Sequence, residues 1–208
     1  MDDNTRTPGT VVRLFTPDGG GRTSPHDSRQ LEGSLLTFSG NENEFYVGSG
    51  RAKEKMPLKT RHIAVETTAI WKMWVDARIV ETVTAIAGRY PVRAQLGHLD
   101  QSEWPPGLGG APADPWQDSR EVKLLRESDY SPFVFCTSSG GGRAACDALR
   151  RSMENARVLR PGQYPIIELA WAPMNTRFGV RSRPDLRICG WWNPDAPTIA
   201  PPDDPAIA

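Results

Sequence analysis

The stretch TSSGGGRAACDALRRSMENARVLRPG, residues 137–162, decides the fold, because it predicts one long helix in a chain that otherwise favours strands. Its apolar residues recur at intervals of three and four: Cys146, Leu149, Met153 and Ala156. That spacing places them on one side of a helix that packs against a sheet. A serine (Ser138 or Ser139) can cap its start, and the Pro-Gly pair at 161–162 ends it. We therefore expect an amphipathic helix near residues 142–160.

Short apolar segments rich in β-branched and aromatic residues lie on both sides of this helix. The segments expected to form strands are residues 34–39, 44–50, 79–85, 121–125, 131–137, 164–172 and 184–192. Trp71 and Trp74 would share a face on a helix and point oppositely on a strand, and we favour a strand. Regular alternation of strand and helix does not occur, which argues against a doubly wound sheet. The sequence predicts a mainly β (α+β) fold: a small antiparallel barrel, OB-like, with one amphipathic helix before the last two strands.

The chain has 208 residues, enough for one domain, and its 19 glycines and 19 prolines favour many turns. We expect a flexible segment over 1–33, a β-rich globular domain over 34–192 and a disordered Pro-rich, acidic tail over 193–208. The segment 51–61 is a basic connector. The Pro- and Gly-rich stretch 102–116 predicts a long ordered loop, because its two tryptophans are costly to leave in water.

Composition argues against several classes of protein. The net charge is zero, so a bulk electrostatic binder of nucleic acid is disfavoured and only a local basic face remains. The three cysteines are widely spaced, which predicts buried reduced thiols rather than disulfides or a zinc ribbon. No histidine pair or nucleophile motif occurs, and so we expect no catalytic residues, no metal and no cofactor. No apolar run approaches the ~20 residues of a membrane span, and the first residues do not resemble a signal peptide. We expect a cytoplasmic protein with no membrane partner.

One segment combines the two residue types that single-strand binders use. In residues 171–192, arginines that can follow a phosphate backbone alternate with aromatic rings that can stack on bases. The candidate nucleic-acid-binding residues there are Trp171, Arg177, Phe178, Arg181, Arg183 and Arg187. The alternative is that the tryptophans belong to the core and the arginines to a solvated loop.

Three further cations complete the candidate interface. Arg143 follows three glycines at the start of the helix, where backbone amides favour anions. The motif lacks the lysine and hydroxyl of a nucleotide-hydrolysing loop, and it serves either a strand phosphate or a simple strand-to-helix turn. Lys53 and Lys55 lie in the basic connector.

The motifs EFYVGSG (44–50), SEWPPG (102–107), DPW (114–116), GGR (141–143) and GWW (190–192) resemble uncharacterised bacteriophage and prophage proteins. The acidic tail is weakly similar to those of OB-fold single-stranded-DNA-binding proteins, but it holds only three acidic residues and ends in Ala-Ile-Ala. The resemblance implies a host bacterial cell and a role in phage replication or recombination, alongside other proteins of those pathways. We therefore expect a non-enzymatic single-stranded-DNA-binding protein; the alternative is a phage structural or adaptor protein acting through protein contacts.

Overall fold

The computed structural model describes residues 33–86, 89–107, 110–177 and 179–195. Within them lie one α-helix, α1 (Gly140–Leu159), and short 3-10 turns at Gly50–Ala52, Arg93–Gln95 and Gln101–Glu103. The strands are β1 (Ser34–Ser39), β2 (Glu44–Val47), β3 (Glu54–Met56), β4 (Arg61–Val75), β5 (Arg78–Val83), β6 (Trp116–Arg126), β7 (Pro132–Thr137), β8 (Tyr164–Thr176) and β9 (Gly179–Trp192).

All nine strands belong to one sheet, in the order β3-β2-β1-β7-β6-β4-β8-β9, with β5 paired to β4. The long strand β4 changes partners along one edge: its start pairs with β8 and its end with β5. Every pair is antiparallel except β1 with β7. The β8–β9 hairpin is therefore an arm held to the rest of the sheet near the start of β8.

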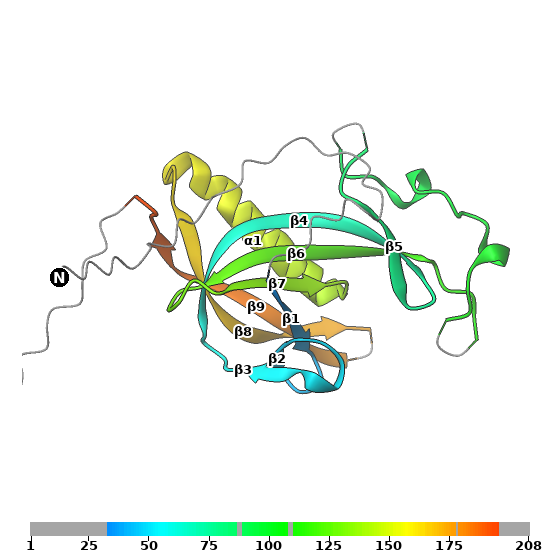
Figure 1. Ribbon diagram of the computed structural model, residues 1–208, viewed down its shortest axis with the longest axis horizontal. Coiled ribbons are helices and arrows are strands. Elements are labelled where there is room, and N and C mark those ends of the chain that lie inside the picture. The colour runs from blue at the N-terminus through cyan, green and yellow to red at the C-terminus, as the bar shows by residue number, and fades with distance from the viewer. Residues whose placement is uncertain (1–32, 87–88, 108–109, 178, 196–208) are drawn as a thin grey trace, which may run out of the picture.

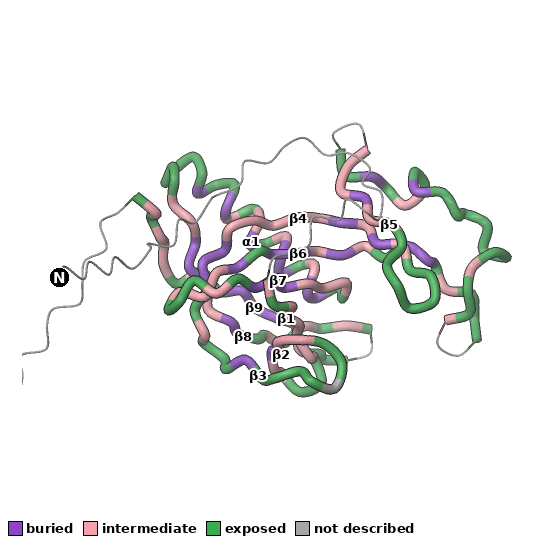
Figure 2. The backbone as a smooth tube through the Cα atoms, in the orientation of Figure 1, coloured by how far each residue is buried: buried purple, intermediate pink, exposed green. Residues whose placement is uncertain are grey.

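The sheet curls strongly into a half-barrel, which brings its two edges towards each other (Figure 1). The turn after β1 packs against β9, and a Cβ at Gly40 would lie 3.0 Å from the carbonyl oxygen of Ser182. Figure 2 shows the buried stretches in the middle of the strands and on α1, whereas the loops near β5 are largely exposed. The main core combines both edges of the sheet, from Leu36 and Phe45 to Leu169 and Leu186.

Helix α1 packs against this core through the predicted stripe. Cys146, Leu149 and Met153 belong to the main core, and Ala156 is also buried. Ser139 is the N-cap, and its hydroxyl accepts a hydrogen bond from the amide of Gly142 at 3.1 Å. The helix begins at Gly140, two residues before the predicted start, because the glycines themselves form the first turn.

The predicted fold class is confirmed: the described part of the chain is mainly β, with one helix before the last two strands. The strand interpretation of Trp71 and Trp74 is confirmed as well, since both lie in β4. The connector at 51–61 is shorter than expected, because residues 54–56 pair with β2 as β3. The parallel pairing of β1 and β7 could not be predicted from the sequence, because the order of apolar and polar residues in a strand does not indicate which strand pairs with it.

The expectations for 1–33 and 193–208 fall almost wholly outside the described residues. No helix in the described part of the chain is both long and apolar enough to cross a bilayer.

Candidate nucleic-acid interface

The register of the β8–β9 hairpin places three of the predicted arginines on one face. Arg181, Arg183 and Arg187 stand opposite Met174, Ala172 and Glu168, and alternate residues of a strand share a face. The other face of the same hairpin supplies Ile167, Leu169 and Leu186 to the core. The arginine face therefore points away from this core near Arg187, whereas towards the tip of the hairpin the start of α1 packs against Met174 and Arg183 on the same face. None of the three arginines is buried.

The three arginines differ in their partners. Arg187 forms an ion pair with Asp185 at 3.3 Å, and 62% of the Arg187 side chain stays exposed. Among the described residues, neither Arg181 nor Arg183 has an ion-pair partner. Exposed ion pairs contribute little to stability, so an anionic ligand can compete for Arg187 at small cost.

A row of aromatic rings lies on the same face, near the other end of the hairpin. The register shifts by one residue at Cys189, since Ile167 pairs with Ile188 but Ile166 pairs with Gly190. This shift places Trp192 and Tyr164 on the arginine side. The Trp192 ring lies 5.9 Å from that of Tyr164 and 6.0 Å from that of Tyr130, between centroids. Tyr130 comes from the turn between β6 and β7, and 44% of it is exposed.

The other aromatic residues of the predicted cluster lie elsewhere. Trp171 stands opposite Pro184, on the hairpin face that the arginines do not occupy. Trp191 carries the guanidinium of Arg160 over its ring, 5.4 Å from the centroid. Phe178 lies outside the described residues. Arginines and aromatic residues alternate along the sequence, but the fold separates them. Arg181, Arg183 and Arg187 form an arginine stripe, and Tyr130, Trp192 and Tyr164 form an aromatic row near its end.

Arg143 lies in a charged network between α1, β6 and the loop before it. Its guanidinium is paired with Asp118, which also accepts hydrogen bonds from Tyr90 and Arg120. Arg120 reaches onward to Asp147 at 2.8 Å. Asp147 stands four residues before Arg151, the spacing of a helical ion pair, but it pairs with Arg120 instead. Arg150 and Glu154, also four residues apart on α1, form an ion pair at 2.6 Å. These contacts give Arg143 a structural role in joining α1 to β6.

Lys53 and Lys55 are also engaged and lie far along the sheet order from β9. The ammonium of Lys53 sits 3.9 Å from the ring centroid of Tyr46, and Lys55 pairs with Glu44 at 2.7 Å. Both are exposed, but acidic side chains accompany them: the Tyr46 hydroxyl donates to Glu42 and Glu44. Charge around these two lysines is thus balanced locally.

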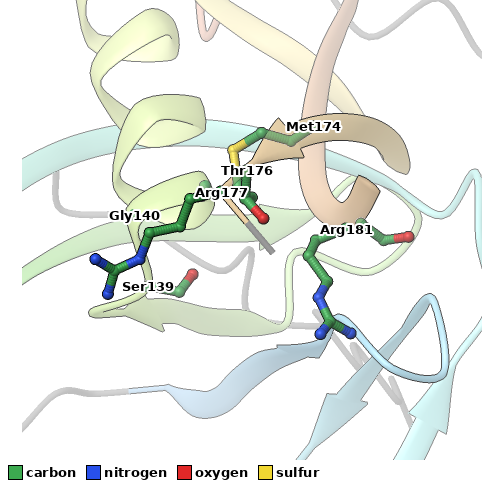
Figure 3. Close-up of a pocket in the computed structure, with 8 residues that line it drawn as sticks. Ser139, Gly140, Met174, Thr176, Arg177 and Arg181 are labelled. Atoms are coloured by element: carbon green, nitrogen blue, oxygen red, sulfur yellow. The ribbon is translucent and has the colours of Figure 1, made fainter. Parts of the chain in front are cut away.

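A pocket of about 650 Å³ lies where the start of α1 meets the tip of the hairpin (Figure 3). Its lining residues are Ser139, Gly140, Gly141, Met174, Thr176, Arg177, Arg181 and Ser182. In Figure 3 the guanidinium groups of Arg177 and Arg181 project from the hairpin in different directions. They extend the positive surface around the tip and do not converge on one point in the pocket.

Close packing accounts for two of the three glycines at the start of α1. A Cβ at Gly142 would lie 2.1 Å from Oγ1 of Thr137, and one at Gly141 would lie 2.7 Å from Cβ of Arg183. No atom within 4 Å would obstruct a Cβ at Gly140. The glycines therefore serve the strand-to-helix turn, and this part of the motif requires no ligand.

Sequence reasoning missed Tyr130 and Tyr164. The signal for Tyr164 was present, because a hairpin that closes beyond Thr176 places residue 164 opposite residue 192 once one bulge is allowed. Tyr130 had no such signal, since it reaches Trp192 only through the curl of the sheet. Comparison of the chain with protein-family models, curated proteins and solved structures gave no match.

Proposed function

We propose that this protein binds single-stranded nucleic acid along the arginine-bearing face of the β8–β9 hairpin, without catalysing a reaction. The observation that carries the proposal is the shared face: Arg181, Arg183 and Arg187 lie on it, and the stripe leads to the ring of Trp192. Cations that follow the backbone and rings that stack on bases are the two components of single-strand sites.

The dimensions of this face suit a short strand. Residues 181 and 192 are separated by roughly 30–35 Å along β9, at ~3.3 Å per residue. OB-like domains bind about 4–16 nucleotides, and a strand at the short end of that range spans this length. We propose that phosphates contact the arginines while bases near one end stack on the aromatic row.

Single strands fit this face better than duplexes. The rings of Tyr130, Trp192 and Tyr164 can stack only on bases that are not already paired and stacked in a helix. Duplex DNA can use only the arginine stripe, and its binding is then weak and strongly dependent on salt. The resemblance to bacteriophage proteins suggests phage replication or recombination as the setting, with DNA as the ligand.

The proposal is tested by titrating the protein with oligo(dT), oligo(dA) and duplex DNA at two salt concentrations, following tryptophan fluorescence. We expect both single strands to quench the fluorescence and to bind more tightly than the duplex. Absence of binding by a folded protein at low salt would refute the proposal.

A second candidate function, contact with other protein chains, is favoured by the β4–β5 hairpin. Trp74, Val75, Ile79 and Val80 are each 36–43% exposed there, which is unusual for large apolar side chains on one hairpin. Within the described residues β5 pairs only with β4, so its outer edge can accept another strand. Sedimentation of wild type and Ile79→Asp tests self-association through this edge, which the substitution should abolish.

A further inference from the structure

Three reactive side chains meet on the face of the sheet that points away from α1. Val122 of β6 belongs to the core beneath the helix, so its neighbour Glu121 lies on the opposite face. Cys136 of β7 stands directly across from Glu121, and Lys72 of β4 reaches the same place from the other side. The cluster thus joins three adjacent strands.

The contacts in this cluster are short and largely shielded from water. Nζ of Lys72 lies 2.7 Å from Oε1 of Glu121, and the two side chains are only 9% and 10% exposed. The same ammonium donates a hydrogen bond to Sγ of Cys136 at 3.2 Å. Cys136 itself is partly exposed, whereas Cys146 is buried.

The electrostatics keep both reactive groups protonated in the resting protein. Burial lowers the pKa of Lys72, but the charges and hydrogen bonds of Glu121 and Cys136 together outweigh it, and the net shift is upward. Burial raises the pKa of the Cys136 thiol. The thiol is therefore slow to react until an oxidant is present at sufficient concentration.

We propose that hydrogen peroxide converts Cys136 and Lys72 into a covalent sulfur–nitrogen cross-link. In the first step the thiol reduces peroxide, which gives the sulfenic acid of Cys136 and one water. Glu121 then takes a proton from the Lys72 ammonium, and the freed amine attacks the sulfur. The S–O bond breaks, the leaving hydroxide takes a proton from the attacking nitrogen to become a second water, Glu121 returns its proton to solvent, and a sulfenamide remains. The thiol and amine together lose two hydrogens, and one peroxide is reduced to two waters.

The geometry favours this outcome at Cys136 over the other two cysteines. The distance of 3.2 Å between nitrogen and sulfur is in the range of a near-attack arrangement. Among the described residues no lysine contacts Cys146, which is buried, or Cys189, whose thiol lies 3.5 Å from the carbonyl oxygen of Ile166. The bond would tie β4 to β7 across β6, and a thiol reductant would reverse it.

The test treats the full chain with hydrogen peroxide at mildly alkaline pH and maps its peptides by mass spectrometry without reductant. We expect a linked pair containing Lys72 and Cys136, lighter than its two peptides by two hydrogen atoms and released by dithiothreitol. Sulfinic or sulfonic acid at Cys136 with Lys72 unmodified, no reaction at Cys136, or a linked pair that retains the peroxide oxygen would each overturn the proposal.

Variants separate the roles of the three residues. Cys136→Ser and Lys72→Arg should both lose the linked pair. Glu121→Gln should slow its formation while leaving trapping of the Cys136 sulfenic acid by a dimedone probe unchanged, because the carboxylate acts on the amine. Equal rates of cross-linking in wild type and Glu121→Gln would contradict the role of Glu121. The wild-type peptide map decides the cross-link itself if a buried substitution prevents folding.

Discussion

Tyr164 stands directly opposite Trp192 across the β8–β9 ladder, with ring centroids 5.9 Å apart and planes inclined at 47°. This pair, with Tyr130 beside it, closes one end of a face whose other end carries arginines. Because the pair lies on the arginine side of the hairpin, a strand that follows the arginines meets the rings.

Replacing Trp192 by Ala should weaken binding of oligo(dT) by about 5- to 150-fold, the equivalent of roughly 1–3 kcal/mol for one stacked base. The salt dependence should change little, because stacking releases few ions. Trp171→Ala is the matched control: Trp171 is 40% exposed but lies on the other face. Equal losses in both variants would show that the aromatic row is not the stacking site.

Replacing Asp185 by Asn should strengthen single-strand binding about two- to fivefold. Asp185 lies on the arginine face between Arg183 and Arg187, and it is paired with Arg187 at 3.3 Å. The substitution frees the guanidinium of Arg187 and removes a negative charge that repels the phosphates. Each effect is modest at an exposed position. Titration at low salt measures the change. Unchanged or weaker binding would exclude Arg187 from the interface.

Replacing Gly142 by Ala should destabilise the fold by about 1–3 kcal/mol, as for overpacked sites. The new Cβ would lie 2.1 Å from Oγ1 of Thr137 and 2.8 Å from Oγ of Ser139. Gly140→Ala is the control, since nothing obstructs a Cβ there and alanine favours helices. Urea unfolding measures both. A Gly142→Ala protein as stable as Gly140→Ala would show that α1 does not begin in this close contact.

Stability should fall in acid because of His62, which is fully buried with Nε2 unpaired. Burial lowers its pKa to about 4, against about 6.5 in an unfolded chain. Between these values the unfolded state binds the additional proton, so the stability contributed by neutral His62 is present above pH ~6.5 and is lost as pH falls towards ~4. Melting temperatures of wild type and His62→Phe over this range should show a smaller acid loss in the variant. An equal loss of melting temperature in acid for both proteins would contradict the lowered pKa of His62.

Much of the fold could be predicted from the sequence, because its local patterns are strong. The spacing of Cys146, Leu149, Met153 and Ala156 specified the buried side of α1, and alternation specified most strands. Tertiary contacts were harder to predict from the sequence. The four-residue spacing of Asp147 and Arg151 fits an ion pair along the helix, but the partner of Asp147 is Arg120, which approaches it from β6. Cys189 was expected to be buried, but the β9 bulge leaves it exposed.

The candidate site could be predicted only in part, for the same reason. Arg181, Arg183 and Arg187 alternate along the sequence, and so a strand places them on one face. Arg143 had the local appearance of an anion-binding residue, but its partner Asp118 lies 25 residues away. The aromatic row depends on one bulge and on the curl of the sheet, and neither leaves a pattern in a single sequence.

The most direct test of the central claim is the salt dependence of oligo(dT) binding by wild type and by the double variant Arg181→Ala/Arg183→Ala. The double variant should bind more weakly, and the slope of log K against log salt should become shallower by about 1.4, at ~0.7 for each phosphate that the protein no longer neutralises. Arg151→Ala/Arg157→Ala removes the same charge from exposed positions on α1 and should keep the wild-type slope. Equal slopes for wild type and the Arg181/Arg183 variant, with both proteins folded, would contradict the account.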